Sequence, residues 1–532
     1  MLTCWEVNST PPAGSSVLNC KEVSFIHKML RIRRAKLLKI VLAALIAIFV
    51  IITMTLLGIT MSFQEIFLKI LYQNLVYAPG SKFFEVWNAS DVSKVKFMAY
   101  VYNLTNSQEV LNGGRLNFEE IGPFVYDEHI TRINTHLSEE NPPKRIRFSH
   151  RHVFVFSRAS SVGSTYETKI IAPNMQYMHF GGTGQHPFVT YTVDELLWNN
   201  RYTVLGFNVA NFGLFASRNN SITKPITLDT GVENIRNVGK VLELNGKRRH
   251  NLFKQDEADM VGGFQAERLS PGLEVGTSVK LLISSVCRSV RAYAVNKTSS
   301  VHRSDVELVV FSGMLPGTSD PSTNWEERIY CNPKEACPPK GLVSFKKCLQ
   351  KDGGNLDLYA SLPRFLNADA RIVKNMDGIP EPNEKEHGSY IHVEPLTGLT
   401  LEGLERIQLN ILMANKNKDY QSMKGPYYMP IVWYIRENIA DKATMDAFKT
   451  QILDARTNTA FAIQLACGLF GMMSVFWAVI LAVLCLRTRK QAEEEEQLTS
   501  VVKCTTFSLG NYESGTPDVE SVETSSILSD ET

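Results

Sequence analysis

Two long apolar stretches frame a chain that otherwise alternates polar and apolar residues. Residues 40–63 carry no charge and consist mostly of Ile, Leu, Val, Ala and Met, and residues 460–486 form a second uncharged stretch. Each exceeds the roughly 20 apolar residues that a helix needs to cross a bilayer. The pattern therefore predicts two transmembrane helices, with residues 1–39, 64–459 and 487–532 outside the bilayer.

Basic residues flank one side of each predicted span. They are Arg31, Arg33, Arg34, Lys36 and Lys39 before the first span, and Arg487, Arg489 and Lys490 after the second. Because basic residues near span ends are retained in the cytosol, both tails are predicted to be cytosolic and residues 64–459 extracytoplasmic. A cleaved signal peptide is disfavoured for the first stretch, since its apolar run is too long and no small-x-small cleavage site follows.

The segment between the spans shows mainly the pattern of strands. Ile407, Leu409, Ile411 and Met413 alternate with polar residues, which is typical of a half-buried strand. Similar runs occupy residues 97–102, 153–156, 279–284 and 306–311. Frequent Gly and Pro and the absence of an obvious linker favour one large ectodomain, mainly antiparallel β with added helices.

Helical spacing of apolar residues marks the approach to each span. It covers residues 63–75, where the first span is predicted to continue as an amphipathic helix, and residues 441–456 before the second span. Residues 1–30 mix polar residues with Pro and Gly and are predicted to be unstructured. The tail at 487–532 carries Glu493–Glu496 and a Ser/Thr-rich acidic stretch, which predicts disorder.

Charge and motifs exclude several classes of function. Charged residues make up 21% of the chain and the formal net charge is +2, whereas a nucleic-acid-binding domain would be strongly basic. Residues 181–184 are glycine-rich but lack the Lys-Ser/Thr of a phosphate-binding loop. His150 and His152 share one face of a predicted strand, and a polar sheet face is favoured over a metal pair. We predict no enzyme activity and no cofactor.

Four cysteines fall in the predicted outer segment, where disulfides persist: Cys287, Cys331, Cys337 and Cys348. Disulfides are favoured over a zinc site because the spacings are not paired C-x-x-C and no suitable histidine is near. Four cysteines allow three connectivities, among which these spacings do not choose. Cys485, at the end of the second span, is a candidate for palmitoylation, with an idle thiol as the alternative.

Acceptor tripeptides for N-glycosylation support the same topology. The form N-x-S/T occurs in the outer segment at Asn88, Asn103, Asn219 and Asn296. Asn8 also matches, but it lies on the predicted cytosolic side and is expected to stay unmodified.

Six short motifs follow one another between the two spans. They are Tyr102–Asn106, Phe118–Tyr126, Asp194–Trp198, Asn211–Phe215, Cys287–Val290 and His392–Gly398. In this order and topology the chain resembles the class B scavenger receptors, also called the fatty-acid translocase family, whose relatives include a lysosomal integral membrane protein and insect sensory neuron membrane proteins. The resemblance covers nearly everything from the first span to the second.

The resemblance implies a fold and a mechanism. The fold is an antiparallel β-barrel with short helices, topped in relatives by a small helical bundle. The mechanism is passage of lipid through an apolar ectodomain tunnel, which avoids exposing about 0.8 kcal/mol per methylene to water. By analogy with the lysosomal relative, Cys331 pairs with Cys337 and Cys287 with Cys348.

Two departures from the family pattern qualify this expectation. The segment between Pro173 and Asp194 is short, and residues 179–187 cannot form a long helix. The apical bundle is therefore expected to be shortened, and no ligand-binding residue is carried over. In the cytosolic tail Thr499 follows Leu498 where a lysosomal signal needs a second Leu or Ile, which favours the plasma membrane over the endosome or lysosome.

The resemblance implies a receptor for membrane lipids, fatty acids, sterols or lipoproteins. The main alternative is a receptor for a protein partner, in adhesion, phagocytosis or enzyme escort. A two-span ion channel is disfavoured, because the second span offers only Gln464, Ser474 and small residues as polar lining. The oligomeric state and the natural ligand stay open.

Overall fold

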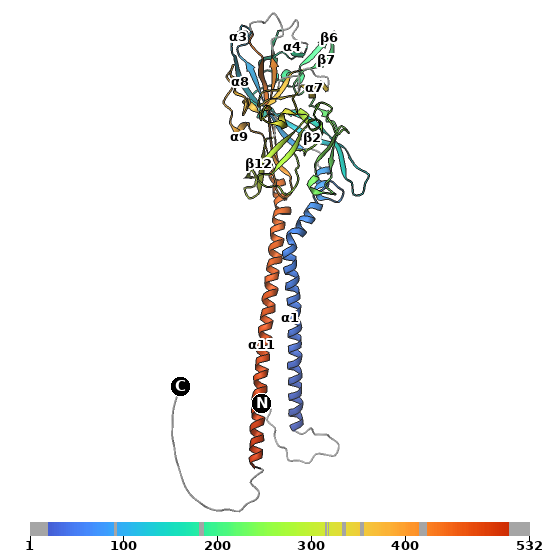
Figure 1. The fold of residues 1–532 in the computed structure, drawn as a ribbon, viewed down its shortest axis with the longest axis vertical. Coiled ribbons are helices and arrows are strands. Elements are labelled where there is room, and N and C mark those ends of the chain that lie inside the picture. The colour runs from blue at the N-terminus through green and yellow to red at the C-terminus, as the bar shows by residue number, and fades with distance from the viewer. Residues whose placement is uncertain are drawn as a thin grey trace, which may run out of the picture. The chain divides into compact units, whose positions relative to one another are not determined.

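A computed structural model of the chain describes residues 20–89, 93–179, 186–313, 317, 319–331, 337–351, 356–413 and 423–509. The chain divides into two compact units, one made of both chain ends and one spanning Ile66–Asp454 (Figure 1). We call the second unit the ectodomain.

The unit of the chain ends contains two long helices, α1 (Cys20–Gln73) and α11 (Ala455–Leu509). Both are long and apolar enough to cross a membrane. They contact each other along their length: the rings of Phe49 and Phe470 lie 6.0 Å apart, and the Cys467 Sγ lies 3.8 Å from the Thr53 carbonyl oxygen. Nearer the chain ends, Lys28 and Glu495 form an ion pair of 3.1 Å.

Both helices extend beyond the predicted spans. As expected from its apolar spacing, α1 continues to Gln73, and it begins at Cys20, earlier than the predicted end of the unstructured segment. The prediction of disorder from residue 487 differs from the structure, because α11 runs on to Leu509. Glu, Gln and Lys are good helix formers, and Arg489 pairs with Glu493 one turn away.

The ectodomain is built mainly from strands. They are β1 (Ser93–Leu104), β2 (Leu116–Leu137), β3 (Arg145–Phe156), β4 (Lys169–Pro173), β5 (Phe188–Thr192), β6 (Arg201–Val204), β7 (Phe207–Asn211), β8 (Ser221–Ile222), β9 (Ile226–Asp229), β10 (Val241–Leu244), β11 (Ser278–Ile283), β12 (Arg288–Ser299), β13 (Glu307–Ser312), β14 (Val343–Ser344), β15 (Leu358–Ser361), β16 (Met376–Asp377), β17 (Tyr390–Val393), β18 (Thr400–Met413) and β19 (Tyr427–Ile439). Each strand run predicted from alternation lies in one of them, apart from its end residues.

Short helices connect the strands. They are α2 (Lys82–Ala89), α3 (Ser107–Leu111), α4 (Met175–His179), α5 (Asp256–Asp259), α6 (Trp325–Arg328), α7 (Lys346–Lys351), α8 (Ala370–Val373), α9 (Glu384–His387) and α10 (Lys442–Phe448). The helix expected before the second span is α10, and its Met445 and Phe448 are buried against Val306 and Leu308.

The main sheet is a nearly closed, barrel-like layer in the order β10-β9-β3-β2-β1-β19-β18-β17-β13-β12-β11, with antiparallel neighbours throughout. Residues 263–264 link its two ends: Val241 at the start of β10 donates to the Gly263 carbonyl, and Phe264 donates to Lys280 in β11. Gly263 has φ +108°, and a Cβ there would lie 2.6 Å from the Lys280 carbonyl oxygen. Glycine therefore permits this close approach.

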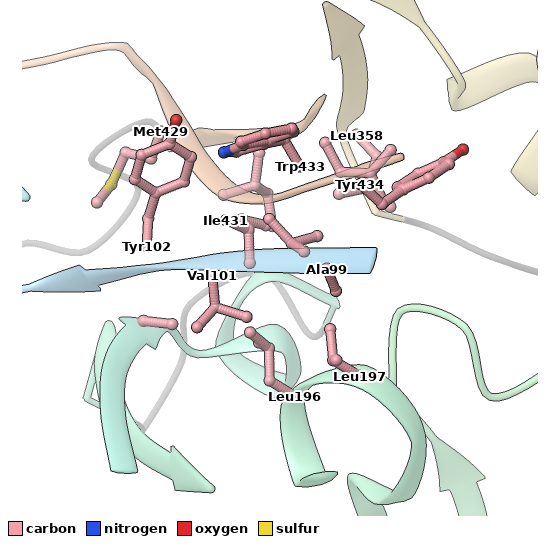
Figure 2. Packing of buried hydrophobic residues seen from close by; sticks show 14 of the residues in the cluster. Ala99, Val101, Tyr102, Leu196, Leu197, Leu358, Met429, Ile431, Trp433 and Tyr434 are labelled. Atoms are coloured by element: carbon pink, nitrogen blue, oxygen red, sulfur yellow. The ribbon is translucent and has the colours of Figure 1, made fainter. Parts of the chain in front are cut away.

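The principal core lies against β1, β18 and β19. The Phe97 ring contacts the Tyr434 and Phe215 rings at centroid distances of 5.1 and 5.2 Å, and all three residues are buried. Figure 2 shows Ala99 and Val101 of β1 pointing toward Leu196 and Leu197. These contacts tie the sheet to the segment that carries the candidate site.

Candidate functional site

The β6–β7 hairpin exposes an unusual amount of apolar surface. Leu205 at its turn is 92% exposed and Phe207 is 77% exposed, and Val204 and Val209 are exposed beside them. Figure 1 shows the two strands at the margin of the ectodomain, near α4. We call these four side chains the apolar tip. Exposed apolar residues that lie together can mark a site of interaction with a protein or a membrane, whereas single exposed apolar residues are ordinary surface.

The turn of the hairpin has a backbone that seldom carries leucine. Leu205 has φ +51° and Gly206 has φ +82°, the two positive values of a type I′ turn. Such turns favour Asn-Gly, whereas a bulky residue with positive φ is strained. The chain thus keeps a large apolar side chain at a position where backbone preference opposes it.

The hairpin has one apolar and one polar face. Tyr202 pairs with Ala210 and Val204 with Phe207, while Thr203 pairs with Asn208 on the other face. The base of the apolar face, Tyr202 and Ala210, packs on the principal core. Val204 and Phe207 of the apolar tip continue that face toward the turn, where both side chains are exposed.

Two of the six motifs hold the base of the hairpin. Leu214 donates its backbone N–H to the Leu196 carbonyl at 3.0 Å, and Phe215 donates to Leu197 at 2.7 Å. The segments Asp194–Trp198 and Asn211–Phe215 therefore pair with each other, and the hairpin is the loop between them. Motif reasoning singled out both segments but missed the hairpin. The available signal was the absence of charge from residue 202 to residue 217.

The expected shortening of the apical bundle agrees with the described residues. Between Pro173 and Asp194 the described elements are α4, of five residues, and β5. Gly181–Gly184 lie outside the described residues.

The two histidines of β3 differ in their surroundings. His152 Nδ1 lies 2.7 Å from Glu128 Oε1, and Arg436 donates to Glu128 Oε2 at 2.8 Å. Burial alone would raise the pKa of Glu128, but the hydrogen bond from His152 and the charge of Arg436 hold it at about 2. Burial lowers the pKa of His150. Within the described residues no group of three potential ligands could hold a metal ion.

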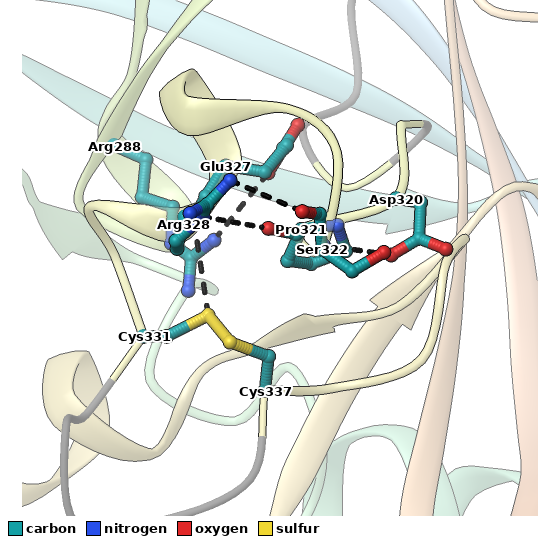
Figure 3. The surroundings of a disulfide bond; sticks show 8 residues. All are labelled: Arg288, Asp320, Pro321, Ser322, Glu327, Arg328, Cys331 and Cys337. Carbon is teal, nitrogen blue, oxygen red and sulfur yellow. Dashed lines mark hydrogen bonds and ion pairs between the residues drawn. A yellow bond between two sulfur atoms is a disulfide. The ribbon is translucent and has the colours of Figure 1, made fainter.

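Two disulfides brace the ectodomain, with the pairing that the family resemblance implies. Cys287–Cys348 joins the start of β12 to α7, and Cys331–Cys337 closes a short loop after α6. Figure 3 shows the second bond beside Arg328, which donates to the backbone carbonyls of Pro321 and Ser322 at 3.1 Å each.

The glycosylation asparagines lie on the ectodomain with different exposure. Asn88, Asn219 and Asn296 are exposed, whereas Asn103 is half-buried and its side chain contacts Glu119 and the Ile171 N–H. The sites stay a prediction.

Replacing each asparagine by Gln is expected to remove one glycan, seen as faster gel migration and by mass spectrometry of the glycopeptides. Asn8→Gln is the matched control, because a tail in the cytosol is not glycosylated. Unchanged migration for all four outer variants would contradict the topology.

The remaining cysteines belong to the chain segments outside the ectodomain. Cys485 is an exposed free thiol on α11, and its palmitoylation stays a prediction. The side chains of Cys4, Cys20 and Cys504 lie outside the described residues.

Comparison with known proteins gives one family. Residues 44–482 match the model of the CD36 family. The chain is 26% identical to Lysosome membrane protein 2 of Rattus norvegicus over 477 residues, which cover 85% of this chain and 96% of that protein. It is 25% identical to Sensory neuron membrane protein 1 of Ostrinia furnacalis (406 residues; 67% and 74%) and 24% identical to Scavenger receptor class B member 1 of Bos taurus (416 residues; 72% and 77%).

Proposed function

The chain belongs to the CD36 family, which includes the class B scavenger receptors, and on that premise we propose that it is a receptor for lipids and lipid-bearing particles. The apolar tip of the β6–β7 hairpin is the proposed contact with the lipid surface. Lipid taken up there would pass through an apolar passage in the ectodomain to the membrane. The family comprises receptors, and we propose no enzyme activity for this member.

The exposed tip is the observation that carries this proposal. Removing a Leu or Phe side chain from water gains about 1.5–3 kcal/mol, and a lipid surface offers that gain without needing a complementary shape. The leucine held at a strained turn position gives independent support, since Asn would satisfy the backbone better. Both facts point to a use for apolar surface at the tip.

A lipid surface fits the tip better than a folded partner does. A stable protein interface uses about 20–30 residues from each side. The apolar tip supplies four side chains, and the opposite face of the hairpin is polar. A receptor for a protein partner therefore stays the second candidate, to be decided by the experiments below.

Polar substitution of the tip is expected to weaken binding to lipid. The variant Leu205→Asn/Phe207→Gln keeps the turn, because Asn-Gly suits a type I′ turn, and it creates no N-x-S/T acceptor for glycosylation. Binding of the full-length protein, with its spans held in nanodiscs, to phosphatidylcholine vesicles should fall at least about tenfold for each side chain changed, measured by vesicle co-flotation. The matched control is Val295→Thr/Val301→Thr, which removes two exposed valines elsewhere and should bind like the wild type.

The cellular test is uptake of a fluorescent long-chain fatty acid and a fluorescent lipoprotein. Cells that display the wild-type chain should take up cargo above background, and cells that display the tip variant should not. Equal surface display of both variants is verified by antibody labelling. Display of the wild type with no uptake of either cargo would reject the lipid function and favour a protein partner.

The same proposal places the protein at the plasma membrane, with both tails in the cytosol. The basic residues outside each span support this orientation. Residence in the endosome or lysosome is the alternative, and one relative is by its name a lysosome membrane protein. Surface biotinylation of expressing cells distinguishes the two locations.

A further inference from the structure

Arg268 is a buried cation without a hydrogen-bonded counterion. Its side chain is 2% exposed, and none of its three nitrogens has a hydrogen-bond acceptor among the residues that the structure describes. Burial lowers the pKa of its guanidinium to about 10, so it stays charged at neutral pH. A charge taken out of water without a partner is strongly disfavoured, so a buried and unpaired arginine is exceptional.

Aromatic rings surround the guanidinium. It lies 4.0 Å from the centre of the Phe83 ring and 5.3 Å from that of Tyr77. The face of each ring attracts the desolvated cation, but a ring edge accepts none of the five N–H groups that lie in the plane of the guanidinium. The rings position the guanidinium, and the Tyr77 hydroxyl interacts with it, but no carboxylate accepts from its N–H groups among the described residues.

A second arginine adds to the positive charge nearby. Arg132 stacks on Trp87 at 4.6 Å, and its Nη2 lies 3.9 Å from a Glu267 carboxylate oxygen. Tyr77 contacts Trp87 edge-on at 5.1 Å and joins the two arginine sites. The arginine–aromatic cluster consists of Tyr77, Phe83, Trp87, Arg132, Glu267 and Arg268. Its residues carry two guanidinium groups and one carboxylate, so the net charge of the cluster is positive.

The wall around this charge is apolar. Tyr77 and Trp87 belong to a buried apolar cluster that includes Phe148, Val238 and Val241. Glu267 is half-exposed, so this side of the arginine–aromatic cluster lies near the protein surface. A complementary ligand therefore combines an anionic group with a hydrocarbon chain.

We propose that Arg268 binds the carboxylate or phosphate of an anionic amphiphile whose chain lies against the apolar cluster. This inference rests on the proposed lipid-binding function and specifies the kind of lipid. The fork of N–H groups on a guanidinium matches two oxygens of a carboxylate or of a phosphate. Hydrogen bonds between charged groups are stronger than those between neutral groups, above all in an apolar site.

The test compares amphiphiles that differ only in the head group. Full-length protein in nanodiscs is titrated with oleate and with oleyl alcohol, and dioleoyl phosphatidate is compared with dioleoylglycerol, by displacement of a fluorescent fatty acid. In at least one of the two pairs, the wild type should bind the anionic ligand about ten- to hundredfold more tightly than the neutral ligand. Arg268→Met should abolish this difference in affinity while the neutral ligand still binds. Binding of the neutral ligand shows that the variant is folded.

Arg288→Met is the matched control. Arg288 is also buried and stacked on an aromatic ring, 4.6 Å from Tyr330, but it has Glu327 as a carboxylate partner at 3.9 Å. Its replacement should leave the anion preference unchanged. If Arg268→Met does not fold, Arg268→Lys and Arg268→Gln ask the same question, because only lysine keeps the charge.

Three outcomes would overturn the inference. Equal affinity of the wild type for anionic and neutral members of both pairs excludes an anion site. So does an anion preference that survives in Arg268→Met. Inorganic phosphate that competes as well as oleate would show a simple ion site instead. The proposed function fails in a different way, with none of the four amphiphiles binding to the wild type.

Discussion

Replacing Arg436 by methionine is expected to lower the free energy of unfolding of the ectodomain by about 3–5 kcal/mol at neutral pH. Arg436 bridges Glu128 of β2 and Glu405 of β18, with nitrogen–oxygen distances of 2.8 Å to each. Glu128 is buried in the sheet, and its other side-chain partner is His152. Loss of the guanidinium leaves the Glu128 carboxylate buried without its positively charged partner. Urea unfolding of the full-length protein in detergent, followed by tryptophan fluorescence, measures the loss.

The pH dependence of the Arg436→Met effect follows from Glu128. In the wild type its folded pKa, at about 2, lies below the unfolded value, so its stabilisation is present above the unfolded pKa and is lost only as the pH falls toward 2. Without Arg436, burial would raise that pKa, and protonation would then relieve the penalty as the medium becomes acidic. The deficit of Arg436→Met should therefore shrink between neutral and mildly acidic pH.

A double variant separates the pair from a general loss of packing. Glu128→Gln/Arg436→Met removes the buried charge together with its partner and should recover part of the stability, since no carboxylate is then left unpaired. Lys297→Met is the control, because Lys297 and Glu307 form an ion pair in which both side chains are exposed. A deficit that is the same at every pH and in the double variant would contradict the proposed role of Glu128.

Local patterns predicted much of the fold because they report local physics. The alternation at Ile407–Met413 lies in β18, and helical spacing around Met445 and Phe448 predicted α10. Closure of the sheet was reached only through the family resemblance. It depends on contacts distant in sequence, such as that between residues 263–264 and both β10 and β11. The helix beyond residue 487 was mispredicted because a run of like charge indicates disorder by composition while its residues favour helix.

The candidate site was harder to predict than the fold. Leu205 and Phe207 look like ordinary strand residues in the sequence, and only the structure shows that they project past the core on which Tyr202 packs. Arg268 carries no motif at all. Its significance depends on Phe83 and Tyr77, which are nearly 200 positions away in the chain. Exposure of apolar groups and burial of a charge are tertiary properties, which periodicity does not report.

Removing the Cys287–Cys348 disulfide is expected to destabilise the ectodomain by about 4 kcal/mol. A disulfide restricts the unfolded chain, and the restriction grows with the length of the loop that the bond closes. Here the bonded cysteines are 61 positions apart, and the loop includes β12, β13 and α6. The variant Cys287→Ser/Cys348→Ser should therefore unfold at a clearly lower urea concentration than the wild type.

The second disulfide supplies the internal control for this loop-length argument. Cys331 and Cys337 are six positions apart, so the same relation gives about 2 kcal/mol for Cys331→Ser/Cys337→Ser. The long-loop variant should thus lose about twice as much stability as the short-loop variant, measured by urea unfolding of both in one detergent. Equal losses would mean that the two bonds act mainly through contacts in the folded state. A larger loss for the short loop would assign the dominant role to the α6 segment, where Arg328 anchors Pro321 and Ser322.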